Sequence, residues 1–125
     1  MQAVLLIFLG GGLGSVLRYT ISKALNPERG FYWGTFTVNI VGCLIIGLIM
    51  GWALKQEDVP HDTIFLAAVG FCGGFTTFSS FALEGQQLLK AGDYTTLLLY
   101  SLLSIMVGIL AVFAGLWLSK IAISS

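Results

Sequence analysis

Charge is the scarcest component of this 125-residue sequence. Only 10% of its residues are Asp, Glu, Lys or Arg, whereas soluble globular domains carry about 25%. A surface that faces water needs more charge than this. The six basic residues are matched by six acidic ones, so the basic excess that nucleic-acid binding requires is absent. The composition therefore excludes a soluble domain and a nucleic-acid-binding protein.

Residues that carry enzyme chemistry are also scarce. The two cysteines, Cys43 and Cys72, fall in uncharged stretches and are interpreted as small buried apolar side chains, not as a disulfide or a metal pair. The single histidine, His61, lies in a polar loop. The sequence offers no nucleophile paired with a general base that could activate it, so no enzymatic activity is expected.

Four long uncharged runs remain between the charges. They cover residues 1–17, 30–54, 63–83 and 94–119. About 20 apolar residues are enough to cross ~30 Å of hydrocarbon as a helix. The sequence therefore predicts an all-α integral membrane protein with one four-helix transmembrane domain over residues 1–125. Its spans are expected at residues 3–25, 34–54, 63–89 and 94–121.

Small residues recur four positions apart within these spans. This spacing lets helix backbones approach closely in lipid, where packing drives association, and it predicts tight helix–helix contacts. The alternative is that glycine is simply frequent in membrane helices. The pairs are Gly10 with Gly14, Gly47 with Gly51, Gly70 with Gly74, and Ala111 with Gly115.

Basic residues are almost evenly divided between the two sides of the membrane. Lys23, Arg29 and Lys90 fall on one side, with Arg18 near it, and Lys55, Lys120 and the N-terminal amine fall on the other. So small a difference specifies orientation poorly, which favours insertion in both orientations. Transport folds often consist of two inverted repeats, and an antiparallel dimer of a short chain has the same symmetry. A single, weakly determined orientation is the alternative.

The third span carries an unusual run, Gly73-Gly74-Phe75-Thr76-Thr77. Two glycines and two β-branched threonines destabilise a helix, so a break is predicted near residues 73–76. An unwound backbone inside a membrane must be buried or line a polar cavity, and its free carbonyls can hold a cation. The alternative is an intact helix whose glycines only pack against a neighbour.

Aromatic and polar side chains follow this predicted break. Phe78 and Phe81 are three residues apart and share a helix face, as do Thr77, Ser80 and Glu84. The edge of a phenyl ring has positive potential that can face an anion. In the second span, Thr37 and Asn39 add donors inside the membrane. Simple packing is the alternative for the phenylalanines.

The run at residues 70–81, Gly-Phe-Cys-Gly-Gly-Phe-Thr-Thr-Phe-Ser-Ser-Phe, resembles the signature G-F-x-G-G-x-T-T-F-S-T-F of the Fluc (CrcB) fluoride channels. Residues 10–18, residues 34–42 and Glu84 also match. The resemblance implies a fluoride-selective channel in the cell (inner) membrane. It would export cytoplasmic fluoride by passive electrodiffusion and protect the cell from fluoride toxicity.

The resemblance also implies how such a channel is assembled. It would be an antiparallel dual-topology homodimer with two fluoride pathways and a structural sodium ion (Na+) at the dimer interface. Backbone carbonyls of Gly73 and Thr76 would hold the sodium, and Arg18 would be a vestibule cation. The fluoride pathway would comprise Asn39, Phe78, Phe81, Tyr100 and Ser104, with the hydroxyls of Thr37, Ser79 and Ser80 as further weak donors.

The fourth span departs from the family pattern at two positions. Gly108 and Val112 stand where family members often continue a track of hydroxyls.

Two other functions are compatible with four spans. A small multidrug-resistance-type proton-coupled cation exporter would also be a four-span dual-topology dimer. It needs a membrane-embedded acid, typically in the first span, and that span has none. A non-transporting assembly subunit would not need a broken, polar span.

Overall fold

The computed structural model describes the backbone of residues 1–124 and the side chains up to residue 121, all in helices and short loops. Four segments are long and apolar enough to cross a membrane, which confirms an all-helical, four-span membrane protein. The helices are α1 (Gln2–Leu25), α2 (Trp33–Ala53), α3 (His61–Thr63), the π-helix η1 (Ile64–Cys72), α4 (Gly73–Phe75), α5 (Phe78–Lys90) and α6 (Tyr94–Ser124).

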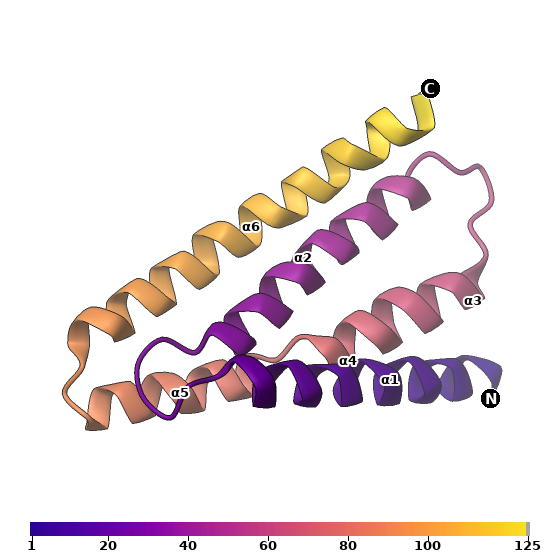
Figure 1. Cartoon of the computed structure of the whole chain (residues 1–125). Helices are drawn as coiled ribbons and strands as arrows, with labels where there is room; N and C mark the ends of the chain where they lie inside the picture. Colours follow the sequence, from indigo (N-terminus) through magenta and orange to yellow (C-terminus); the bar gives the residue numbers. More distant parts are fainter. Residues whose placement is uncertain (125) are drawn as a thin grey trace.

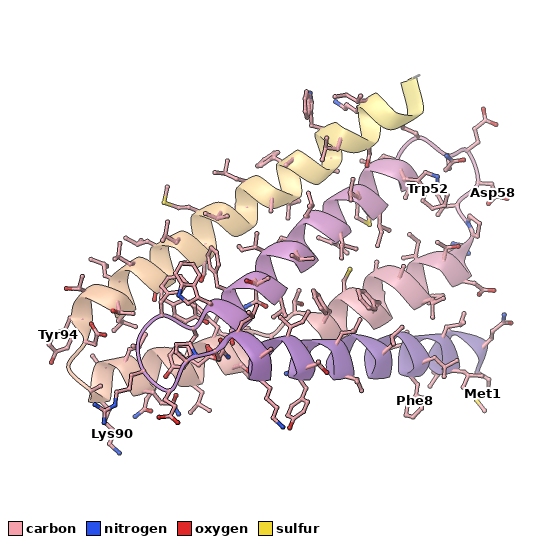
Figure 2. All side chains as sticks on the ribbon, viewed as in Figure 1. Met1, Phe8, Trp52, Asp58, Lys90 and Tyr94 are labelled. Atoms are coloured by element: carbon pink, nitrogen blue, oxygen red, sulfur yellow. The ribbon has the colours of Figure 1, made fainter. Side chains whose placement is uncertain are left out.

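The spans pack as two close pairs. Helix α6 lies along α2, and α1 lies along η1 and α4, with both chain termini at the same end (Figure 1). Lys90 and Tyr94 mark one end of the molecule, and Trp52 and Asp58 mark the other (Figure 2). The spans therefore alternate in direction, and the polar loops lie at the two ends.

Glycine makes the contact within each pair possible. A methyl group at Gly14 would collide with the Phe71 carbonyl oxygen, and one at Gly74 would collide with the Gly11 carbonyl oxygen. In the other pair, Gly47 meets the Val112 carbonyl oxygen in the same way. Backbone thus lies directly against backbone, which confirms the tight packing predicted from the glycine spacing.

The third span is broken, as predicted, but not at its glycines. Gly73 keeps helical angles (φ −61°, ψ −41°), while Thr76 (φ −89°, ψ 157°) and Thr77 (φ −151°, ψ 119°) are extended. Gly74 lies in α4, where its missing side chain lets α1 approach closely. The β-branched threonines suit the extended conformation, so they and not the glycines interrupt the helix.

Candidate functional site at the helix break

Asn39 joins α2 to the interrupted span. The backbone N–H of Thr77 donates to Asn39 Oδ1 (2.8 Å), and Asn39 Nδ2 donates to the Thr77 carbonyl oxygen (3.1 Å). These bonds satisfy both backbone groups that the break frees at Thr77. An amide nitrogen has two hydrogens, so one N–H of Asn39 is not used in these bonds, and Asn39 lines the neighbouring cavity.

Arg18 approaches the break from α1. Its Nε donates to the Gly74 carbonyl oxygen (3.0 Å), and Ser15 Oγ lies 3.5 Å from the same oxygen. The guanidinium thus sits at the C-terminal end of α4, where the free carbonyls concentrate negative potential. The residue expected to be a vestibule cation is therefore half-buried and tied to the break.

Two other carbonyls at the break have no donor. Within residues 1–124, no N–H or hydroxyl bonds to the carbonyl oxygen of Gly73 or of Thr76, while the Thr76 N–H and hydroxyl both bond to the Cys72 carbonyl oxygen (3.0 and 2.8 Å). Both residues line the same cavity. Hard carbonyl oxygens are ligands for a hard cation, so the pair chosen from sequence fits a sodium ion.

This cavity has a volume of about 500 Å³ and lies between α2, α6 and the broken span. Asn39, Phe78, Phe81 and Ser104 line it, together with Thr77 and several apolar side chains. The Ser104 hydroxyl is buried and has no hydrogen-bond partner among the described residues. A buried polar atom without a partner is costly, so the described residues leave one donor unsatisfied at the wall of the cavity.

Aromatic rings follow one another from the cavity into the protein. The centroids of Phe78 and Phe81 are 5.9 Å apart, and those of Phe81 and Tyr100 are 5.1 Å apart. The predicted shared face of the two phenylalanines is therefore present. Phe78 is 80% exposed, so one side of this row of rings is uncovered in the single chain.

Tyr100 is fully buried and lies beyond the residues that line the cavity. Its hydroxyl donates to Glu84 Oε2 (2.7 Å), and the Thr35 hydroxyl donates to Glu84 Oε1 (2.6 Å). Sequence reasoning chose Tyr100 for the pathway but missed Thr35, whose place one helical turn before Asn39 was the available signal.

The remaining predicted donors lie around the start of α5 or outside the cavity. The Thr77 hydroxyl caps α5 by accepting from the Ser80 N–H (3.1 Å), and it lies 3.3 Å from the Ser79 hydroxyl. Ser79 is exposed, and Thr37 is half-buried on α2 without lining the cavity. At Gly108, named above as a departure from the family's track of hydroxyls, the Cys43 Sγ lies 3.5 Å from the position of a β-carbon.

Comparison with known proteins decides the family. Residues 5–116 match the model of the family described as CrcB-like protein, Camphor Resistance (CrcB). The chain belongs to the CrcB family. Relatives of this CrcB chain are named fluoride-specific ion channel FluC, and they match it over nearly their full length. That of Phocaeicola vulgatus is 47% identical over 96% of this chain and 100% of its own. That of Flavobacterium psychrophilum is 43% identical, covering 96% and 98%.

Proposed function

We propose that this chain is a fluoride-selective ion channel that lets cytoplasmic fluoride leave the cell by passive electrodiffusion. The carrying observation is the cavity beside the helix break, which is lined by the Asn39 amide, the unpaired Ser104 hydroxyl and the rings of Phe78 and Phe81. These groups can replace the water that a small anion gives up. The relatives named as fluoride channels identify fluoride as that anion.

The chemistry of the lining suits conduction better than tight binding. None of the described residues that line the cavity is basic, and each donor is individually weak. An ion must enter such a site favourably and still leave it. A negative-inside potential assists export by ~2.3 kcal/mol per 100 mV, so the proposed channel needs neither ATP nor an organic cofactor.

The working unit that we propose is an antiparallel homodimer with two pathways. The broken face has free carbonyls and a Phe78 ring that is 80% exposed. Free backbone carbonyls are not stable against lipid, whereas a second copy would bury them. The near balance of basic residues at the two ends permits insertion in both orientations.

A structural sodium ion at the centre of this dimer is part of the proposal. The Gly73 and Thr76 carbonyls of one chain would supply two ligands, and those of an antiparallel copy would supply two more. When bound, the ion would neutralise the free helix ends. Replacing sodium by N-methylglucamine should lower the melting temperature of the purified dimer. An unchanged melting temperature would contradict the sodium site.

The test of function is efflux from liposomes that contain the purified protein. Fluoride should leave when a potassium ionophore clamps the voltage, while chloride is retained. The alternative, proton-coupled cation export, predicts uptake of a quaternary ammonium ion and no passive fluoride flux. It also needs an accessible acid deep in the membrane. Glu84, in the second half of the third span, is only 8% exposed and accepts hydrogen bonds from two hydroxyls.

A further inference from the structure

A line of hydrogen bonds links the α1–α2 loop to the buried Glu84. Asn26 follows the last residue of α1, and its Oδ1 accepts from the backbone N–H groups of Gly34 (2.7 Å) and Thr35 (3.1 Å). Its Nδ2 donates to Thr35 Oγ1 (3.1 Å). The Thr35 hydroxyl then donates to Glu84 Oε1 (2.6 Å).

The direction of each hydrogen in this line is determined. Two backbone N–H groups point at the Asn26 oxygen, so the amide cannot be turned over, and its nitrogen must face Thr35. Because that nitrogen only donates, the Thr35 oxygen accepts there and its single hydrogen goes to Glu84. Tyr100 supplies the second hydrogen to the carboxylate. Both carboxylate oxygens of Glu84 thus accept a hydroxyl hydrogen, one from Thr35 and one from Tyr100.

The line ends beside the candidate pathway. Glu84 is 8% exposed and Thr35 is 1% exposed, and the Tyr100 ring that Glu84 holds contacts Phe81. The carboxylate therefore fixes one end of the row of rings, and its two hydroxyl donors come from α2 and α6. A carboxylate without these donors would be a mobile anion next to an anion pathway, where it would compete with fluoride for donors.

We propose that Asn26 is a positioning residue of the pathway, which fixes the Thr35 hydroxyl as a donor to Glu84 and so holds this carboxylate and Tyr100 in place. The proposal rests on the proposed fluoride conduction. It assigns to the α1–α2 loop, outside the membrane spans, control over a buried charge in the third span.

The test reverses the direction of the hydrogen bonds. Asn26→Asp keeps an acceptor for both backbone N–H groups but removes the donor to Thr35, so two carboxylates compete for one hydroxyl hydrogen. Glu84→Gln in the same chain supplies the missing donor: its amide nitrogen donates to Thr35, Thr35 donates to Asp at position 26, and Tyr100 still donates to the Gln oxygen. Gln86→Glu, an exposed change on α5, adds the same charge without touching the line.

We expect fluoride efflux per dimer to fall about tenfold in Asn26→Asp and to stay unchanged in Gln86→Glu. In the Glu84→Gln background, Asn26→Asp should cost no further flux, and the melting temperature should exceed that of Asn26→Asp alone. An equal loss in both backgrounds would overturn the proposal.

A second variant serves if Asn26→Asp yields no dimer. Thr35→Val retains the Asn26 bonds to the backbone and should lower flux at least fivefold. Unchanged flux in Thr35→Val would overturn the proposal.

The same measurements separate this proposal from the proposed function. Melting temperatures are compared for the unaltered protein, Asn26→Asp, Glu84→Gln and the double variant. The coupling is the difference between the effect of Asn26→Asp alone and its effect in the Glu84→Gln background, and it can be measured whether or not the protein conducts. If the unaltered protein passes no fluoride but the coupling is present, fluoride conduction fails and the hydrogen-bond line stands. If the protein conducts and the coupling is absent, the role of Asn26 is wrong.

Discussion

Asn39 both holds the helix break together and offers a donor to the cavity. Asn39→Asp changes the single atom that donates to the Thr77 carbonyl, so two oxygens would face each other at 3.1 Å. Loss of this part-buried bond costs about 1–3 kcal/mol, and the new charge repels an anion. We expect a lower melting temperature and no measurable fluoride efflux. Wild-type efflux in Asn39→Asp would show that the residue does not face the ion.

Phe81 is the ring that contacts both Phe78 and Tyr100. Phe81→Ile keeps an apolar side chain but removes the ring edge, which is worth about 1 kcal/mol to an anion. A barrier raised by that amount slows passage about fivefold. We expect this loss of efflux per dimer, with unchanged elution on a sizing column, and a similar loss in Phe78→Ile.

The control for these rings lies on α6, where Phe113 is 62% exposed and does not line the cavity. Phe113→Ile should leave efflux unchanged. If Phe78→Ile and Phe81→Ile both conduct normally per dimer and only destabilise it, the rings pack and do not line the pathway.

At the scale of elements, the close pairing of α1 with η1 and α4 places the break. A methyl group at Gly14 would meet the Phe71 carbonyl oxygen and the Phe75 nitrogen, whereas at Gly12 it would meet nothing within 4 Å. Gly14→Ala must push α1 away from α4, which we expect to cost about 1–3 kcal/mol and to loosen the Arg18 bond to Gly74.

Gly12→Ala is the matched control, since both glycines lie in α1 and the change adds the same methyl group. Alanine favours a helix over glycine by about 1 kcal/mol, so Gly12→Ala should melt no lower than the unaltered protein. Thermal unfolding in detergent compares the two variants. Equal melting temperatures for both would mean that the backbone contact at Gly14 does not stabilise the fold.

The third span shows which features of the fold the sequence predicts and which it does not. Four spans follow from uncharged runs, and a break follows from adjacent helix-breaking residues. The π-helical form of η1 has no such signal, because residues 64–72 form a plain apolar run. Propensity also does not tell which residues of the run 73–77 leave the helix: Gly73 and Gly74 stay helical, while Thr76 and Thr77 are extended.

The candidate site also contains residues that the sequence indicates and residues that it does not. Asn39 stands out in the sequence because an amide is costly inside a membrane, and Phe78 and Phe81 because they share a helix face after the predicted break; all three line the cavity. The line through Asn26, Thr35 and Glu84 could not be predicted, because its members are 9 and 49 residues apart and meet only where the Thr35 hydroxyl reaches Glu84 in the folded chain. Asn26 in a loop before a proline is also typical of an ordinary turn.

At the scale of the whole molecule, orientation is the property that the sequence leaves open. Lys23, Arg29 and Lys90 belong to one end, and Lys55 and Lys120 belong to the other. Few basic residues decide membrane orientation, and near balance permits both. If the working unit is an antiparallel dimer, a chain forced into one orientation cannot assemble it, although each copy still folds.

Paired charge variants test this requirement. Gln56→Lys with Glu57→Lys adds two basic residues at the Lys55 end, and Gln86→Lys with Ala91→Lys adds two at the Lys90 end; all four positions are exposed. We expect each double variant to insert in one orientation, shown by labelling of a C-terminal tag in intact cells, and to lose protection against fluoride. Co-expression of the two should restore it, because opposite orientations meet again. Full protection by either variant alone, with its tag on one side only, would refute the antiparallel dimer.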